Sequence, residues 1–414
     1  MLKFIREFCD EKKLSEYVFI CNKIEKLELV CSNGNIENSN VINLSKNLII
    51  FRDNNRYYKI MTPDCAHGIL SQVVENHKTE TNFAWMNLQS DAKLLIEPDS
   101  SDRDFVCSVN PINTEIFTSR LSSLMEKYGV LAGQFLVTRH AAHRIGPQKQ
   151  CSQAYCEIQY MLNCMDATTG ELIPKYGKLH DFDELDNALE RNDDSFFSGN
   201  TPQKDIEHGV LSGIIYFPVE IMIPIYTLLL TALNGEMISN DLSLIKPCQF
   251  GSQLISPCIT ITDEPFFSNK AKIIFDAEGA EVFTKVLVKD GVLMQALNNL
   301  KTAAVLSQLP GNCYTNYANY SQEIRWSTVK IDVKDVGNRH YDVRIEQFND
   351  NELHMNVQTG CLSIEVLGYD TAAKKKKRYR FDLTIEQLLS RVIGGVGDYS
   401  TNGDIVARDV LLSF

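Results

Sequence analysis

The sequence predicts an α+β fold, with an N-terminal antiparallel sheet carrying helices and a C-terminal antiparallel, barrel-like β domain. Short apolar or alternating runs bounded by turn residues fill most of both halves, which is typical of antiparallel strands. The chain also lacks the long alternation of strands and helices that builds a parallel sheet. Its 414 residues exceed one ordinary core, because domains hold about 100 to 200 residues. We therefore expect domains over residues 1–195 and 206–414, with a polar, acidic boundary near Arg191–Asp205.

Composition and charge indicate an ordinary globular protein. Hydrophobic residues make up 44% and charged residues 23% of the chain, so neither disorder nor a membrane protein is indicated. The net charge of −12 argues against nucleic acid as a main partner, because clustered lysines and arginines drive binding to phosphates. The most apolar segment, Phe217–Leu233, contains Glu220 and Pro224 and falls short of the roughly 20 apolar residues that span a bilayer.

The cysteines and the N-terminus predict the compartment. Twelve cysteines are scattered without a CxxC pair, which favours reduced, mostly buried thiols over a disulfide framework in a chain of this length. The first residues, MLKFIREFCDEKKL, are charged and lack the apolar core of a secretory signal. We expect a helix here, and a cytoplasmic protein without a membrane segment.

The first half predicts a meander, then helices and two more strands. Five short strands are expected at Tyr17–Cys21, Lys26–Ser32, Asn40–Leu44, Asn47–Arg52 and Arg56–Met61. Apolar residues at helical spacing predict helices over Asp64–Asn76 and Asn113–Tyr128. Strands are expected after the second helix, over Leu131–Arg139 and Ala154–Asn163.

The second half begins with a predicted strand in Gly209–Pro218 and a buried helix within Phe217–Leu233. Short strands are then expected at Gln253–Thr262, Ile324–Val333, Tyr341–Gln347, Leu362–Leu367 and Arg378–Leu383, with a helix at Ile385–Val392. Gly394, Gly395 and Gly397 follow this helix. We interpret them as a helix stop and a loop, because a phosphate-binding loop needs a strand before it and a helix after it.

The stretch Lys270–Gly311 specifies its local structure most plainly. An acidic turn, Phe275–Gly279, precedes an apolar run that reaches Asp290-Gly291 and a second apolar run. Asp-Gly between two such runs predicts a β-hairpin. A short helix is expected to follow and to end before Pro310.

Histidines offer little support for a metal site. No HExxH or HExxxH helix is present, and no histidine lies between Gly209 and Arg339. His140, His143, Cys151 and Cys156 are the nearest group of soft ligands, but their spacing matches no common zinc template. We favour surface or packed side chains over a zinc site. No G-x-S-x-G elbow or activated-cysteine signature marks a nucleophile either.

Two charged segments each allow two interpretations. The basic run Lys374–Arg380 fits an anionic partner, but we favour a solvated hairpin edge protected by lysines. Asp276 and Glu278 lie two residues apart, so in an extended turn both can face one side and hold a cation or a substrate amine. Alternatively, Asp276 caps the turn through the backbone.

The stretch resembles the signature region of the TldD/PmbA family. The likeness rests on the run FDAEG, the hairpin ending in DGVL, the helix TAAVL, and Gly311-Asn312 after it. It extends upstream to Phe250-Gly251 and the run SPCITITDEP. Members of this family act as heterodimeric proteases, in which one subunit carries an HExxxH zinc motif and the other has lost it while helping to form an enclosed peptide-binding cavity.

The resemblance implies the metal-free subunit, because Phe217–Leu233 stands where the zinc subunit has its motif and contains no histidine. It implies no catalytic residue and no cofactor in this chain, with zinc in a TldD-like partner, or a second copy of the chain as partner, and a peptide as substrate. Residues implied for the cavity wall are Phe275, Asp276, Glu278, Gly279, Gly311 and Asn312. The glycines are also interpreted as fold determinants.

Two other functions remain open at this point. The family's older label, gyrase modulator, implies a regulatory or binding protein without proteolysis, which the basic run alone supports. A homodimeric hydrolase with its own chemistry is the third possibility.

Overall fold

The computed structural model of the chain describes residues 7, 9–14, 16–33, 35–53, 56–62, 88–89, 112, 114–165, 172–179, 185, 206–265, 273–316, 321–337, 339–348 and 354–414. The chain divides into two compact units. Unit 1 comprises Met1–Ala188, Ser268–Phe283 and Asn298–Ile324, and unit 2 comprises Leu189–Phe267, Thr284–Leu297 and Arg325–Phe414. The C-terminal half therefore contributes two segments to unit 1. The predicted boundary near residues 191–205 lies outside the described residues.

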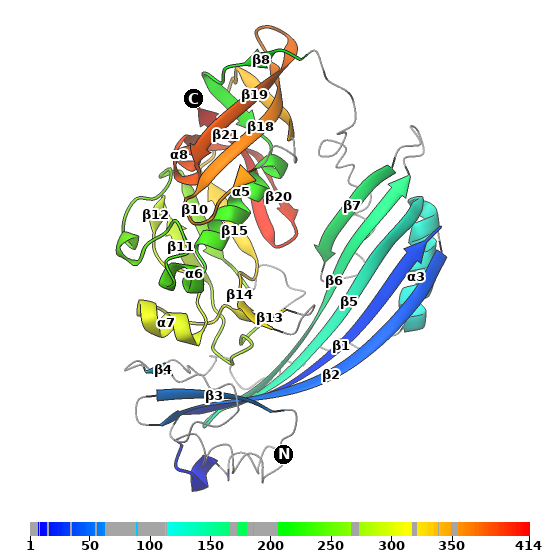
Figure 1. Cartoon of the computed structure of the whole chain (residues 1–414), viewed down its shortest axis with the longest axis vertical. Helices are drawn as coiled ribbons and strands as arrows, with labels where there is room; N and C mark the ends of the chain where they lie inside the picture. Colours follow the sequence, from blue (N-terminus) through cyan, green and yellow to red (C-terminus); the bar gives the residue numbers. More distant parts are fainter. Residues whose placement is uncertain are drawn as a thin grey trace. The chain divides into compact units, whose positions relative to one another are not determined.

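Unit 1 is built on a seven-stranded sheet in the order β4-β3-β2-β1-β5-β6-β7, with every neighbouring pair antiparallel. Its strands are β1 (Tyr17–Ser32), β2 (Asn35–Asp53), β3 (Arg56–Thr62), β4 (Leu88–Gln89), β5 (Val130–Ile145), β6 (Gln150–Met165) and β7 (Leu172–Leu179). The long strands curve together, and helix α3 (Thr114–Lys127) lies on their outer face (Figure 1). The helix predicted over Asn113–Tyr128 is thus confirmed.

The first four of the five strands predicted before residue 62 are wrong in length, because β1 and β2 are continuous, whereas the fifth, Arg56–Met61, is confirmed by β3. Their pairing runs from Tyr17 opposite Phe51 to Ser32 opposite Asn35. Polar residues that lie between the predicted strands, such as Lys23 and Ser45, face each other on an exposed part of the sheet. Polar side chains at exposed positions leave the backbone ladder intact. The helix predicted over residues 64–76 lies outside the described residues.

One face of this sheet is completed by residues from the C-terminal half. Its core cluster consists of Val18, Ile20, Leu48, Ile50, Tyr57, Ala142, Cys151, Ile274, Phe275, Ala280, Leu300 and Ala303. Phe275 and Leu300 are fully buried, and burying such a side chain stabilises the fold by about 1.5–3 kcal/mol. The segment around the acidic turn is therefore part of the core of unit 1.

Unit 2 contains a twelve-stranded sheet in the order β12-β11-β10-β15-β21-β9-β16-β18-β19-β8, with β17 paired to β18 and β20 paired to β21. Its strands are β8 (His208–Gly209), β9 (Ile214–Phe217), β10 (Ile259–Asp263), β11 (Lys285–Lys289), β12 (Val292–Leu293), β15 (Val329–Val333), β16 (Val343–Phe348), β17 (His354–Met355), β18 (Cys361–Asp370), β19 (Lys375–Thr384), β20 (Val392–Asn402) and β21 (Ile405–Ser413). Three pairings, β15–β21, β16–β9 and β19–β8, are parallel. The α+β class is confirmed.

Two local predictions in unit 2 have different outcomes. The Asp-Gly hairpin is confirmed: Asp290 and Gly291 have φ values of 47° and 77°, as a tight two-residue hairpin turn requires. The loop predicted at Gly394, Gly395 and Gly397 is wrong, because these residues lie in β20. Gly394 and Gly395 pair with β21. Hydrogen bonds to this partner strand hold them in a strand that the local sequence does not predict.

Four short helices and one 3₁₀ turn complete the described parts of residues 206–414. They are α5 (Val219–Ala232), α6 (Gly235–Ser239), η2 (Pro247–Gln249), α7 (Leu300–Leu306) and α8 (Ile385–Ser390), of which α7 belongs to unit 1. Helix α5 confirms the predicted buried helix, and its first N–H, from Val219, donates to Oδ1 of Asp409 at 2.8 Å. Among the described residues, none of the helices has the length and apolarity needed to cross a membrane.

Candidate functional site

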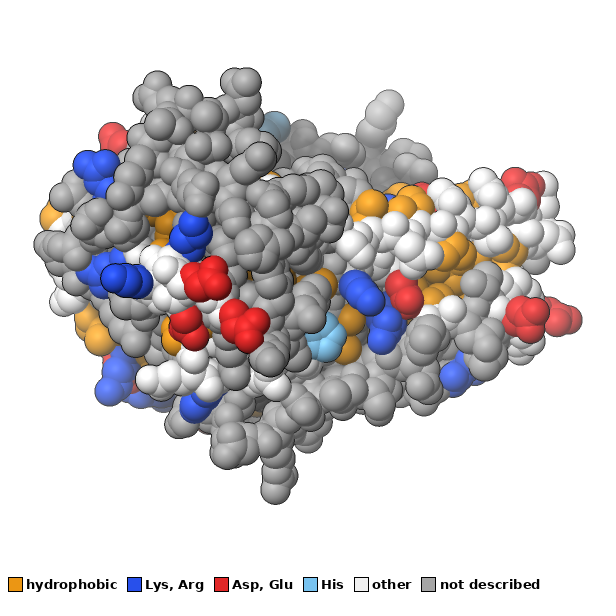
Figure 2. Space-filling view, turned by 90° about the horizontal axis from the view of Figure 1, so that it is seen from below, with side chains coloured by type: hydrophobic (Ala, Val, Ile, Leu, Met, Phe, Trp, Pro, Cys, Tyr) orange, Lys and Arg blue, Asp and Glu red, His pale blue; other side chains and the backbone are white. Residues whose placement is uncertain are grey.

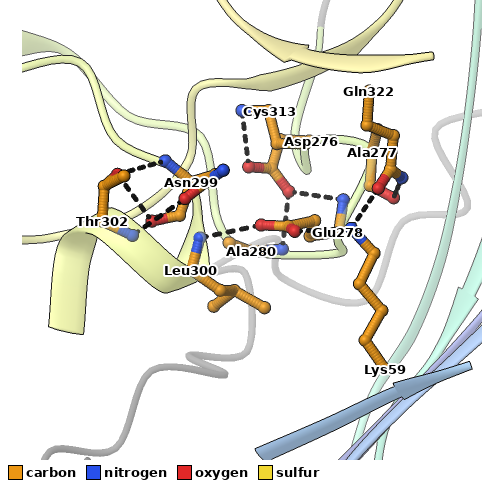
Figure 3. Close-up of polar contacts among 10 residues, drawn as sticks. All are labelled: Lys59, Asp276, Ala277, Glu278, Ala280, Asn299, Leu300, Thr302, Cys313 and Gln322. Carbon is orange, nitrogen blue, oxygen red and sulfur yellow. Dashed lines mark hydrogen bonds and ion pairs between the residues drawn. The ribbon is translucent and has the colours of Figure 1, made fainter. Parts of the chain in front are cut away.

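The acidic turn is held by the carboxylate of Asp276 (Figure 3). Oδ1 accepts hydrogen bonds from the backbone N–H groups of Glu278 and Ala280 at 2.9 and 3.0 Å, and Oδ2 accepts one from the N–H of Cys313 at 3.0 Å. Asp276 is 2% exposed. The backbone-capping interpretation of Asp276 is thus confirmed, and the same carboxylate also joins the turn to strand β13 (Cys313–Thr315).

Glu278 joins the turn to two other elements. Its Oε1 lies 2.7 Å from Nζ of Lys59 on β3, and its Oε2 accepts a hydrogen bond from the N–H of Leu300 at 2.7 Å. Lys59 also donates to Gln322 of strand β14 (Gln322–Ile324), whose Nε2 donates to the carbonyl oxygen of Ala277 at 3.1 Å. Figure 3 shows the side chain of Lys59 extending from β3 toward Glu278 and Gln322. One buried ion pair therefore ties the turn to the sheet.

Helix α7 begins beside this ion pair. Its N-cap, Asn299, accepts the N–H of Thr302 at 2.9 Å, and Oγ1 of Thr302 accepts the N–H of Asn299 at 3.2 Å, which forms a capping box. Glu278 takes the N–H of Leu300, the first residue of the helix. A carboxylate is stabilised at a helix N-terminus, where free N–H groups and the helix dipole are both positive.

The backbone of the turn is fixed against the sheet. Gly279 has φ of +74°, and a Cβ there would lie 2.4 Å from Cγ1 of Val18, so glycine is required both for conformation and for close approach. Arg144 Nε donates to the carbonyl oxygen of Gly279 at 2.8 Å. The side-chain amide of Gln153 donates to the carbonyl oxygen of Phe275 at 2.8 Å and accepts from the N–H groups of Ile274 and Phe275.

Asp276 and Lys59 both have raised pKa values, for different reasons. Burial, and secondly the charge of Glu278, raise the pKa of Asp276 to about 7, against the lowering effect of its backbone hydrogen bonds. Burial alone would lower the pKa of Lys59, but the charge and hydrogen bond of Glu278, with smaller contributions from Cys313 and Asp276, outweigh it and raise that pKa. Lys59 is therefore held charged by Glu278, whereas the raised pKa of Asp276 brings its protonation into the neutral pH range.

The predicted cavity-wall residues lie together in unit 1. The side chains of Phe275, Asp276, Glu278 and Asn312 are buried, and Gly311 has φ of +109°. The N–H of Asn312 donates to the carbonyl oxygen of Asn298 at 2.9 Å. Their contact with a peptide stays a prediction. The acidic turn is joined to the residue after Asn312, because Cys313 donates its N–H to Asp276.

Three residues that bond to the acidic turn were not predicted from the sequence: Lys59, Arg144 and Gln153. Each occupies a core-facing position of a strand. Gln153, for example, lies on the same strand face as Cys151 and Tyr155, which are both buried. A polar residue in a core-facing register marks a buried hydrogen-bond partner, so the pattern held a usable signal.

Neither the helix that stands at the place of the zinc motif nor the nearest group of soft ligands forms a metal-binding set. Helix α5 has Glu220 as its one carboxylate, contains no histidine and buries nine of its residues in apolar contacts. His140 and Cys151 lie on one face of the β5–β6 ladder and His143 and Cys156 on the other, because side chains alternate along a strand. Among the described residues, no group of three or more histidine, cysteine, aspartate or glutamate side chains is arranged to hold a metal ion.

The basic run is matched by carboxylates. Most of its cations form ion pairs: Lys375 with Glu207, Lys376 with Glu346, Lys377 with Asp370, Arg378 with Glu365 and Arg380 with Asp382. These ion pairs favour the predicted solvated hairpin edge over a site for a polyanion. On the face drawn in Figure 2, which is seen from below, some described lysines and arginines likewise lie beside aspartates or glutamates.

Comparison with known proteins identifies the family. Residues 215–382 match the model of the PmbA/TldA metallopeptidase C-terminal domain. This part of the chain is a TldD/PmbA-family domain. The resemblance predicted from the acidic turn and hairpin is thus confirmed. No curated protein matches the chain.

Three solved structures share the fold across nearly the whole chain. A proposed modulator of a DNA gyrase from Thermotoga maritima is 14% identical with a TM-score of 0.67, and covers 99% of this chain and 98% of its own. TldE from Thermococcus kodakarensis is 14% identical with a TM-score of 0.64 and the same two coverages, 99% and 98%. A proposed modulator of DNA gyrase from Bacteroides thetaiotaomicron is 12% identical with a TM-score of 0.60, covering 100% and 96%. At this identity the likeness shows the fold.

Proposed function

We propose that this chain is the metal-free subunit of a TldD/TldE-type metallopeptidase, which helps a zinc-containing partner to bind and process unfolded or modified peptides in the cytoplasm. The observation that carries the proposal is the combination of a metallopeptidase-family domain over residues 215–382 with the absence of any histidine between Gly209 and Arg339 in the sequence. Peptide hydrolysis with zinc then requires ligands from another subunit. The likeness to TldE supports the same role.

In this role the chain helps to form the peptide site and contributes no reactive side chain. The acidic turn and Asn312 are buried and engaged by neighbouring groups, so they fix the position of the backbone around them. A rigid wall of this kind holds an extended peptide by backbone hydrogen bonds and needs no reactive side chain. We propose that the partner subunit performs the hydrolysis.

The test separates this chain from its partner. The chain is purified alone and together with a TldD-type subunit carrying HExxxH, and zinc content and hydrolysis of an unfolded peptide are measured. We expect zinc and activity only in the mixed preparation, and loss of activity when the motif glutamate of the partner is replaced. Glu220→Gln in α5 is the matched control, and we expect it to change neither readout. Stoichiometric zinc with activity in the isolated chain would overturn the proposal. Zinc-free hydrolysis by the isolated chain would instead favour the homodimeric hydrolase.

Binding to nucleic acid is the weaker candidate. Its support was the basic run, and five cations of that run are paired with carboxylates. Replacing Lys374–Lys377 by glutamine should therefore leave DNA retention at low salt unchanged. A salt-dependent affinity that these replacements abolish would revive the gyrase-modulator hypothesis.

A further inference from the structure

In the described part of the chain, the two carboxylates of the acidic turn have one cation in direct contact. Asp276 and Glu278 are both carboxylates, both are buried, and Lys59 is the cation in direct contact with Glu278. Asp276 is satisfied by three neutral backbone N–H groups. Two buried like charges that share one counter-charge compete for ionisation, because neither is solvated by water.

Other elements packed against the turn do not supply a second cation for Asp276. From β5, Arg144 directs Nε to the carbonyl oxygen of Gly279. From β6, Gln153 is neutral and bonds the backbone of residues 274 and 275. From β13, Cys313 supplies no positive charge, and in its ionised form it would raise the pKa of Lys59. The direct contacts of Asp276 are therefore backbone dipoles, and Lys59, which is bonded to Glu278, acts on Asp276 only through its charge.

We propose that Lys59, Asp276 and Glu278 form a proton-linked clamp, in which uptake of one proton by the two carboxylates fastens the segments that the C-terminal half contributes to unit 1, and loss of that proton loosens them. The clamp reaches each element needed for this effect. Lys59 belongs to β3, Leu300 begins α7, and Cys313 begins β13. This inference is independent of the proposed peptidase role.

The direction of the effect follows from the burial. A raised pKa of Asp276 in the folded state means that the closed cluster binds a proton more tightly than the opened one, in which water reaches the carboxylate. Lower pH therefore favours the closed cluster, and higher pH favours local opening. The buried N–H groups that Asp276 and Glu278 accept from should report the opening directly.

Residue-resolved hydrogen exchange on the full chain tests the clamp. The amides of Glu278, Ala280, Leu300 and Cys313 are followed between about pH 6 and about pH 8.5, with rates divided by the intrinsic exchange rate, and we expect their protection to fall about tenfold. Asp276→Asn should remove this pH dependence. Glu278→Gln, which removes the like charge and leaves Lys59 as counter-charge, should move the fall to lower pH.

The matched control is Asp290→Asn, an equivalent change at an exposed turn of unit 2, which should leave the pH dependence at the four amides unchanged. Protection in the wild type that does not vary with pH would overturn the proposal. An equal fall in Asp276→Asn would overturn it as well. If Asp276→Asn does not fold, the Glu278→Gln profile decides: a fall at the wild-type pH contradicts the clamp.

Discussion

The acidic turn Phe275–Gly279 and the basic hairpin of β18 and β19 both gather charges beside a tight turn, yet they treat those charges differently. In the acidic turn, Asp276 and Glu278 are 2% and 1% exposed. In the hairpin, the side chain of Lys375 is 52% exposed, and that of its partner Glu207, which precedes β8, is 63% exposed. Water can replace either partner of the exposed pair, whereas a buried group that loses its partner pays the full desolvation cost.

The difference teaches that burial, not the number of charges, decides where charge matters in this chain. The basic run has the more conspicuous sequence, but its ion pairs are exposed or only partly buried. The acidic turn has two carboxylates, and each is bonded to the backbone of a different element. Substitutions should therefore have large effects in the turn and small effects in the hairpin.

The largest effect is expected for Lys59→Met. The substitution leaves Glu278 buried without its cation, and breaking a buried ion pair from one side costs about 3–5 kcal/mol. Urea denaturation followed by circular dichroism measures the loss.

A double variant distinguishes charge from packing. In Lys59→Met with Glu278→Gln, the glutamine still accepts the N–H of Leu300 but carries no charge, so this protein should be more stable than Lys59→Met alone. If the double variant is no more stable than Lys59→Met, lost packing of the lysine stem explains the effect, and the contrast with the hairpin is not electrostatic.

Gly279→Ala should have the next largest effect. The new Cβ would lie 2.4 Å from Cγ1 of Val18, in a residue with φ of +74°, so strain and overpacking together should cost about 2–4 kcal/mol. Gly403→Ala is the control, because Gly403 has φ of +57° with no atom within 4 Å of its Cβ position. Thermal or urea unfolding compares the two, and equal losses would mean that backbone strain alone is responsible.

Much of the fold could be predicted because local chemistry determined it. Asp290-Gly291 favours a hairpin turn in any context, and the apolar spacing around Leu121 and Leu124 specifies α3. Strand length, in contrast, was not determined by local chemistry. Lys23 and Ser45 interrupt the apolar pattern but not the ladder, since the backbone bonds of β1 depend on its partner strands.

The candidate site also has one part that the sequence predicts and another that depends on the fold. Asp276 and Glu278 were predicted as a functional pair from their spacing, and the capping role of Asp276 is a local effect. Lys59 lies 219 residues away from Glu278 in the sequence, and no spacing rule connects them. Only the fold brings Lys59 to this turn, so the cation of the cluster could be suspected from its core-facing register but not assigned.

Stability should depend on pH through Asp276. Its pKa is about 7 in the folded chain against an ordinary value of 3.8, so the stability it contributes is fully present below about pH 4 and lost as pH rises through about 7. Between about pH 6 and 8.5, the difference in unfolding free energy between wild type and Asp276→Asn should change by about 1.4 kcal/mol. Urea denaturation at each pH measures it, and parallel pH profiles would contradict the assignment to Asp276.

The smallest effect is expected for Lys375→Gln in the basic hairpin. The hydrogen bond and charge of Lys375 hold the pKa of Glu207 below its ordinary value, so the substitution should raise that pKa in an NMR titration. The urea midpoint should stay unchanged, because both groups keep their water when the pair is broken. A lower midpoint would show that the exposed pair supports the fold after all, and would remove the contrast with Lys59 and Glu278.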